Sequence, residues 1–379
     1  MIPNREALTM AAATRYRQNN PFTPMFGRVP PYMAGREQII DEMAAAFETG
    51  DADPNLCSIF TGARGTGKTA LLTHLAFRAE QLGWITASVT ASDGMLEDIL
   101  QRLRESGAHL VSGGAAKRVS SIGIARLGSI SWESVTDGER NWRTKMNVLF
   151  DQLEETDTGV LITVDEVDAS FQQMTELVTT YQHFVREGRK VSLLMAGLPF
   201  RVSSLLTGKS TSFLRRAAQH SLGSIPSYEV KEAFRLTVED AEKSISDEAL
   251  DAAAGAIDGF PFMFQLVGYR AWNAARQGDV ITLQDVEQGG KIAQEELESR
   301  VFLSTLAELS TGDLEFLRVM NVSGPTGRGV IGERLDKPSG YVSTYKRRLL
   351  EAGVIEEPMP GTLRFALPGF GQYLARIAE

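Results

Sequence analysis

The stretch that decides the fold is GARGTGKT, residues 62–69, which matches the pattern G-x-x-x-x-G-K-[ST] at every fixed position. An apolar run with the character of a strand, Leu56–Thr61, comes directly before it, and the helical run ALLTHLAFRAEQ follows it. A phosphate-binding loop requires this order of strand, loop and helix. The match and its setting together predict a P-loop at residues 62–69.

The residue types of this loop suit a triphosphate. Its glycines let consecutive backbone N–H groups turn toward phosphate oxygens, where a Cβ would obstruct them, and the start of the following helix adds a favourable field. Lys68 can reach the β- and γ-phosphates, and the Thr69 hydroxyl can ligate Mg²⁺. The predicted ligands are ATP or ADP with Mg²⁺, bound by Gly62, Ala63, Arg64, Gly65, Thr66, Gly67, Lys68, Thr69 and Ala70.

A second apolar run, GVLITVDEVD at residues 159–168, ends in carboxylates. Strands buried on both faces read as continuous apolar runs, and open α/β sheets bind ligands at the carboxyl ends of their strands. We therefore expect Asp165 to hold Mg²⁺ and Glu166 to polarise the water that attacks the γ-phosphate. The alternative is that Asp168, and with it Asp165, caps the next helix. We assign Asp168 to that cap and leave it out of the site.

Composition excludes several classes of protein. The 379 residues have the length of two to three domains, and 43% apolar and 23% charged residues are typical of globular chains. With 39 basic and 48 acidic residues the net charge is −9, so any contact with nucleic acid needs a local basic patch. The single cysteine, Cys57, excludes a disulfide framework and a Cys-rich zinc site. No apolar run is long enough to span a membrane and the N-terminus lacks the apolar core of a secretory signal, so we expect a cytoplasmic protein without a membrane partner.

Short apolar runs alternate with amphipathic helical runs up to Pro226, which predicts an α/β fold whose parallel sheet has helices on both faces. The further strands that we expect are residues 84–90, 159–164, 191–196 and 220–225. A stretch rich in Gly and Ser at about 111–135 interrupts the alternation, and we interpret it as an insertion. Residues 227–306 are predicted to be helical throughout.

Residues 307–379 show the order helix, short helix, helix and two short strands, which resembles a winged helix-turn-helix. Its third helix, GYVSTYKRRLLEAG with Ser339 as N-cap, would be the recognition helix. Residues 324–350 hold six basic and two acidic residues, a local charge of +4 that suits double-stranded DNA. The residues that we expect to touch DNA are Tyr341, Lys346 and Arg347. Because winged helices also contact proteins, that alternative stays open.

From residue 20 onward the chain resembles the AAA+-type P-loop ATPases. It is most similar to the branch that contains the replication-initiator and origin-recognition ATPases, the archaeal-type ATPases and the STAND signalling ATPases. This resemblance implies four parts: an N-terminal extension (1–33), a P-loop ATPase domain (34–226), a helical lid (227–306) and a winged-helix domain (307–379).

The element AGRE at residues 34–37 is similar to one that these families carry before the first helix. The resemblance implies that Gly35 and Arg36 lie near the nucleotide. The alternative for Arg36 is a surface charge at the start of a helix.

Two further elements carry residues of that family's site. FLRRA, residues 213–217, stands before the last strand, where such families use an arginine to sense the γ-phosphate, often from a neighbouring subunit. Arg216 is the better match, Arg215 is the alternate, and a solvated pair is the plain alternative. GFPF, residues 259–262, is similar to the STAND element whose proline packs on the adenine, so the resemblance places Pro261 at the nucleotide; a simple helix start is the alternative.

The chain departs from that family in two places. The strand VSLLMA runs into Gly197–Leu198–Pro199, where a polar sensor residue is usual, and the lid has GFPF with no clear Gly-x-Arg element. Both departures favour slow, switch-like turnover. We therefore predict an ATPase that couples its nucleotide state to a winged helix able to bind DNA, acting as a homo-oligomer or with a protein partner. The alternative is a nucleotide-gated signalling scaffold whose winged helix contacts protein only.

Overall fold

The computed structural model describes residues 20–25, 27–50, 52–111, 141–275 and 278–378. By their packing these residues divide into two compact units. The sheet unit comprises residues 37–62 and 68–222; the helical unit comprises residues 63–67, the chain from residue 223 onward and the segment before residue 37. The predicted insertion at 111–135 lies, from residue 112 on, outside the described residues.

The sheet unit contains a five-stranded parallel sheet with the strand order β2-β3-β4-β1-β5. The strands are β1 (Cys57–Thr61), β2 (Ile85–Thr90), β3 (Val160–Asp165), β4 (Val191–Gly197) and β5 (Ala218–Ser221). Strand β4 is buried along its whole length and β3 up to its last residue, as their continuous apolar runs predict. The parallel sheet predicted from the alternation is confirmed.

The predicted position of the fifth strand, residues 220–225, is wrong. The last bond of this strand to β1 joins Leu222 N to Thr61 O at 2.6 Å, and the strand itself ends at Ser221. Pro226 is already the N-cap of the next helix. The apolar residues Leu222 and Ile225 made the run look longer, although both are buried outside the strand.

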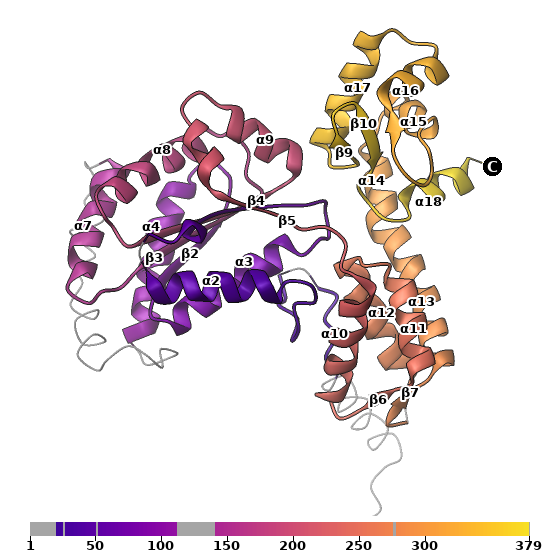
Figure 1. Ribbon diagram of the computed structural model, residues 1–379, viewed down its shortest axis with the longest axis horizontal. Helices are drawn as coiled ribbons and strands as arrows, with labels where there is room; N and C mark the ends of the chain where they lie inside the picture. Colours follow the sequence, from indigo (N-terminus) through magenta and orange to yellow (C-terminus); the bar gives the residue numbers. More distant parts are fainter. Residues whose placement is uncertain (1–19, 26, 51, 112–140, 276–277, 379) are drawn as a thin grey trace, which may run out of the picture. The chain divides into compact units, whose positions relative to one another are not determined.

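Helices cover both faces of this sheet (Figure 1). One face carries α2 (Glu37–Thr49) and α3 (Lys68–Gln81). The other face shares one hydrophobic core with α4 (Met95–Val111), α7 (Trp142–Glu154), α8 (Gln172–Arg186) and α9 (Pro199–Thr207). The sheet is therefore the middle layer of three, which leaves the ends of its strands as the places where a ligand can approach.

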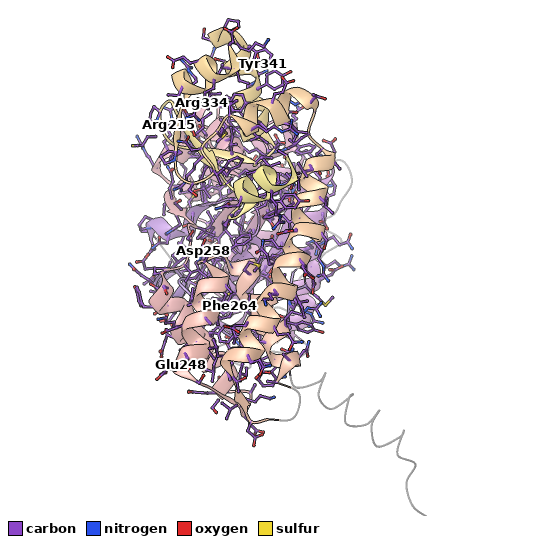
Figure 2. The ribbon with its side chains drawn as sticks, turned by 90° about the vertical axis from the view of Figure 1, so that its right-hand side faces the viewer. Arg215, Glu248, Asp258, Phe264, Arg334 and Tyr341 are labelled. Atoms are coloured by element: carbon purple, nitrogen blue, oxygen red, sulfur yellow. The ribbon has the colours of Figure 1, made fainter. Side chains whose placement is uncertain are left out.

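The helical unit begins with α10 (Ser227–Glu239), α11 (Asp247–Ile257), α12 (Pro261–Ala274) and α13 (Leu283–Leu297). The prediction that residues 227–306 are helical throughout is wrong in one detail, because β6 (Ser244–Ile245) and β7 (Val280–Ile281) form a short parallel pair. Phe22, from the segment before α2, is buried here against the rings of Phe234 and Phe264, of which Phe264 is labelled in Figure 2.

Helix α13 continues through a π-helical turn, η3 (Glu298–Phe302), into α14 (Leu303–Ala307). The elements that follow are α15 (Thr311–Arg318), β8 (Thr326–Gly327), α16 (Arg328–Leu335), α17 (Ser339–Glu351), β9 (Ile355–Met359), β10 (Thr362–Phe365) and α18 (Phe370–Ile377). Their three strands pair antiparallel in the order β8-β10-β9. The predicted three helices and two strands are present, whereas β8 and α18 were not predicted. Over the described ranges, no helix has both the length and the apolar character to cross a membrane.

Candidate nucleotide-binding site

The loop of residues 62–67 joins β1 to α3, which begins at Lys68. Two of its glycines adopt left-handed backbone angles, Gly65 with φ +80° and Gly67 with φ +86°, a region in which a side chain is unfavourable. The Lys68 Nζ group donates to the carbonyl of Gly62 at 2.9 Å, so the side chain curls back over the loop. The predicted strand, loop and helix are thus all present, with the lysine on the loop.

Thr69 and Asp165 stand 96 positions apart in the sequence and meet in the sheet unit. The Thr69 hydroxyl donates to Asp165 Oδ2 at 2.5 Å, because α3 starts and β3 ends at the same edge of the sheet. A hydroxyl and a carboxylate are oxygen ligands of the kind that Mg²⁺ prefers, with water and phosphate oxygens completing its octahedron. The two side chains therefore fit a magnesium ion held between them.

Glu166 follows directly and has a left-handed backbone, with φ +52°. The chain is held on both sides of this residue: Asp165 O accepts from Ala91 N at 3.0 Å, and Val167 N donates to Ala196 O at 2.9 Å. Its own N–H donates to Asp165 Oδ1 at 2.9 Å. The side chain of Glu166 is exposed, so this carboxylate is open to water at the edge where Asp165 lies.

Asp168 does not cap the next helix, and the prediction that it does is wrong. Helix α8 starts at Gln172, and its N-cap is Phe171, without a side-chain cap bond. Asp168 Oδ1 instead accepts from Ser170 N at 2.9 Å, and its other oxygen forms an ion pair with Arg201 of α9. Three residues lie between Asp168 and α8, so neither Asp168 nor Asp165 caps this helix.

Arg216 ends the 3₁₀ turn η2 (Ser212–Arg216), two residues before β5. Because Ala218 pairs with Ser58, the start of β5 lies beside the start of β1, whereas the phosphate loop follows the other end of β1. At about 3.3 Å per residue, roughly 16 Å of chain separates Arg216 from that end. Arg216 is exposed there, and the alternate, Arg215, donates to Leu206 O at 3.0 Å. Arg216 therefore lies at the opposite edge of the sheet from the end of β1.

Arg36 is 8% exposed, so the alternative of a surface charge at the helix start is wrong. Its Nη2 group donates to Gly223 O at 2.9 Å and its Nη1 group to Gly35 O at 3.0 Å. Gly35 has φ +69°, and a Cβ on it would lie 2.9 Å from a carboxylate oxygen of Glu229. Within the helical unit, Arg36 therefore joins the residues that precede α2 to the segment after β5.

Pro261 is the first residue of α12, as the helix-start alternative predicted, and Phe260 is its N-cap. Both lie against the phosphate loop within the helical unit. A Cβ on Gly65 would be 2.5 Å from the ring of Phe260, and one on Gly67 would be 3.9 Å from Pro261 Cβ. Phe260 was missed at the sequence level, although an aromatic residue directly before a proline at a helix start was its signal.

The basic side chains of α17 face carboxylates of their own chain. Lys346 Nζ lies 2.6 Å from Glu357, Arg347 Nε lies 3.8 Å from Glu351, and Arg348 Nη2 lies 3.0 Å from the buried Asp313. All three carboxylates lie outside the window 324–350, so the local charge of +4 is largely compensated in the fold. The N-cap of α17 is Pro338, and the prediction of Ser339 is wrong.

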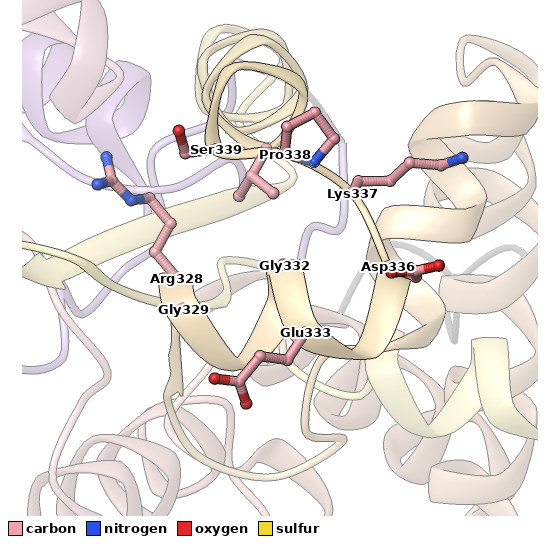
Figure 3. A pocket seen from close by; sticks show the side chains of 9 residues that line it. Arg328, Gly329, Gly332, Glu333, Asp336, Lys337, Pro338 and Ser339 are labelled. Carbon is pink, nitrogen blue, oxygen red and sulfur yellow. The ribbon is translucent and has the colours of Figure 1, made fainter.

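The ring of Tyr341 (labelled in Figure 2), the third residue predicted to touch DNA, lies 4.5 Å from that of Tyr345 on the same helix. A hollow opens where α16 turns into α17, with Arg328 and Lys337 at its two ends (Figure 3). Glu333 and Asp336 also line this hollow, so its charges cancel.

Comparison with known families assigns the first half of the chain. Residues 32–194 match the AAA ATPase domain, a range that includes the phosphate loop and Asp165. Residues 32–194 are therefore an AAA-type P-loop ATPase domain, and the chain resembles the AAA+ ATPases. Residues 299–374 match a domain of unknown function, DUF8462. Among curated proteins no sequence matches this chain.

Solved structures share the fold of this chain at low sequence identity. The Walker-type ATPase PABY2304 of Pyrococcus abyssi is 14% identical with a TM-score of 0.66, over 93% of this chain and 100% of that one. The ADP form of the ORC2 protein of Aeropyrum pernix is 16% identical with a TM-score of 0.56, over 94% of this chain and 96% of that one. The likeness extends past the matched ATPase domain and supports the origin-recognition-like fold predicted for the chain.

Proposed function

We propose that this chain is an ATP-binding and slowly ATP-hydrolysing molecular switch. The observation that carries this proposal is the contact between Thr69 and Asp165 at the edge of the sheet where the phosphate loop begins. A threonine after the P-loop lysine and an aspartate at the end of β3 are the two protein ligands that a Mg-nucleotide requires in such folds. The exposed Glu166 beside them adds a carboxylate able to act on water.

The chain's own residues divide the chemistry among them. The loop amides and Lys68 hold the β- and γ-phosphates, and Thr69 and Asp165 hold the metal ion. Bound Mg²⁺ supplies charge neutralisation on the phosphates. Glu166 accepts a hydrogen bond from the attacking water and orients it toward the γ-phosphate. Because Arg216 lies away from the end of β1 where its own phosphate loop begins, it does not sense the γ-phosphate of its own chain, and we expect turnover well below the enzyme median of about 10 s⁻¹.

The helical unit gives a physical route from nucleotide to C-terminus. Residues 63–67 of the phosphate loop pack with Phe260 in this unit, and α13, η3 and α14 form one continuous helical stretch. The buried Phe302 at the end of η3 lies 5.2 Å, ring to ring, from both Phe370 and Tyr373 of α18. We infer that a change at the loop is passed along this stretch to the C-terminal helices as a movement of packed elements.

The position of Arg216 favours a function in trans. Because it lies at the edge of the sheet away from its own phosphate loop, Arg216 can serve the nucleotide of a neighbouring copy only. We therefore expect ATP turnover per chain to rise with protein concentration, and particle mass to increase with ATP but not with ADP. Light scattering and a phosphate-release assay over the same concentrations test this. Turnover that is independent of concentration in a monomer would remove the role of Arg216.

We further propose that residues 307–379 form a winged helix whose third helix is α17. Contact of α17 with DNA through Tyr341, Lys346 and Arg347 stays a prediction. The ion pairs of Lys346 and Arg347 favour the second candidate, a nucleotide-gated scaffold in which this winged helix contacts a protein, because phosphates would have to displace the chain's own carboxylates.

Binding to a fluorescent DNA duplex separates these two candidates. For the scaffold we expect no measurable anisotropy change at 50 mM salt, with ATP or with ADP. A winged helix that contacts several DNA phosphates would instead bind the duplex at 50 mM salt, and its affinity would be about 10³-fold lower at 200 mM salt. Arg347→Ala would then weaken binding, whereas Arg102→Ala, which removes a similar i,i+4 ion pair from α4, would not. That second pattern would overturn the scaffold and establish DNA contact.

A further inference from the structure

The ends of β3 and β4 carry an ion pair that the sequence did not indicate. Asp168, three residues after Asp165, pairs through Oδ2 with Arg201 of α9. Arg201 stands four residues after Gly197, the last residue of β4. Gly197 pairs with Thr61 at the end of β1, and its carbonyl accepts from Gly62 N at 3.4 Å. The pair therefore lies at the edge of the sheet where the phosphate loop begins.

Arg201 is carried by an element that cannot move freely. Helix α9 has the sequence PFRVSSLLT and starts with Pro199, a residue that is favoured in the first turn of a helix. Val202 and Leu205 fix α9 in the core, at 2% and 1% exposure. Arg201 is its one charged side chain, with 40% of the side chain exposed against 22% for Asp168. Because α9 is held in the core, Arg201 can hold the neighbouring loop, residues 165–170, in place through its ion pair with Asp168.

The loop that it meets carries Glu166. Between Asp165 and Asp168 the chain passes through the left-handed backbone of Glu166 and the buried Val167, whose side chain packs against Gly197. Asp168 Oδ1 then accepts from Ser170 N, which closes a turn. A non-glycine residue in the left-handed region persists when the surrounding structure holds it on both sides. On the C-terminal side of Glu166, the ion pair between Asp168 and Arg201 is a side-chain contact that holds the chain in place.

We propose that Arg201 is a positioning residue for ATP hydrolysis, which acts through Asp168 to fix the segment 165–170 and thus the carboxylate of Glu166. The proposal rests on the proposed function, because it takes Glu166 as the group that orients water. Arg201 touches neither nucleotide nor water in this role. An ion pair of this exposure adds little to global stability, so its loss acts on the placement of Glu166 rather than on folding.

Arg201→Ala tests this directly. We expect kcat for ATP hydrolysis to fall by about 10- to 100-fold, the range that misplacement of a reacting group causes, while the Kd values for Mg-ATP and Mg-ADP and the melting temperature change little. Asp168→Asn keeps an acceptor for Ser170 N and removes the charge, and we expect the same fall. The double variant should be no slower than either single variant, because the two residues act as one unit. Arg143→Ala, which breaks the ion pair between Arg143 on α7 and Glu187, the C-cap of α8, is the matched control.

Single-turnover hydrolysis in the Glu166→Gln background separates this proposal from the proposed function. If Arg201 acts through Glu166, adding Arg201→Ala slows this background no further. If Glu166→Gln itself hydrolyses ATP at the normal rate, the assignment of Glu166 fails, whatever Arg201 does. If Glu166→Gln is inactive while Arg201→Ala keeps a normal kcat, only the role of Arg201 is overturned. A loss of affinity for ATP but not for ADP in Arg201→Ala would also overturn it, because the side chain would then contact the γ-phosphate.

Discussion

Lys68→Ala is expected to lower the affinity for Mg-ATP by about 100-fold or more, since it removes charge-assisted hydrogen bonds to two phosphates. The Lys68 ammonium already lies over the phosphate loop, on the carbonyl of Gly62. Displacement of a fluorescent ATP analogue measures the change. Lys209→Ala, which removes an exposed lysine before η2, is the control and should bind normally.

The result of Lys68→Ala is informative only if the variant folds. Its melting temperature without nucleotide should stay close to that of the unchanged protein, because Lys68 is only partly buried and its Nζ group bonds a loop carbonyl. Normal affinity in a folded Lys68→Ala variant would mean that residues 62–69 do not bind the triphosphate.

Glu166→Gln is expected to leave the affinity for Mg-ATP within about twofold and to lower kcat by about 100-fold or more, the contribution of a positioned general base. Glutamine has the same shape and can keep the left-handed backbone, so the substitution removes the charge and little else. Steady-state phosphate release together with nucleotide binding measures both effects. Glu176→Gln changes an exposed glutamate on α8 that has no place in the proposed site, and this variant should turn over normally.

Unchanged turnover in Glu166→Gln would mean that a residue other than Glu166 acts as the general base for ATP hydrolysis. The variant is also useful if the prediction holds, because it keeps ATP bound. It would then hold the chain in its ATP state for measurements of particle mass and of partner binding.

The central parts of the site could be predicted because their signals are local. The phosphate loop is a contiguous motif between a strand and a helix, and the apolar run before Asp165 placed that carboxylate at the end of a parallel strand. Because ligands bind at the carboxyl ends of parallel strands, Thr69 and Asp165 could be predicted to lie close together although they are 96 positions apart. In the structure their side-chain oxygens lie 2.5 Å from each other.

The residues that were missed or misread depend on tertiary contacts. Asp168 was assigned to a helix cap, but α8 begins four residues later and its carboxylate pairs with Arg201, 33 positions away. Arg36 looked like a surface charge as readily as a site residue until its burial was known.

Counting charge along the sequence failed for the C-terminal segment for the same physical reason. The basic residues of α17 are neighbours in sequence, whereas Glu357 and Asp313 reach them from other elements. The net charge of +4 counted over residues 324–350 therefore overstates the positive charge of the folded surface, because Lys346, Arg347 and Arg348 are paired with carboxylates outside that window. Arg216 shows a related limit, because only the register of β5 with β1 reveals at which edge of the sheet it lies.

Calorimetric titration of the full chain with ADP, in the presence and absence of Mg²⁺, tests the central claim most directly. The account predicts one saturable site per chain, with tighter binding when Mg²⁺ is present and no gain from Mg²⁺ in an Asp165→Asn variant. Absence of any binding heat with ADP or with a slowly hydrolysed ATP analogue, at protein concentrations well above those that switch ATPases need, would contradict it.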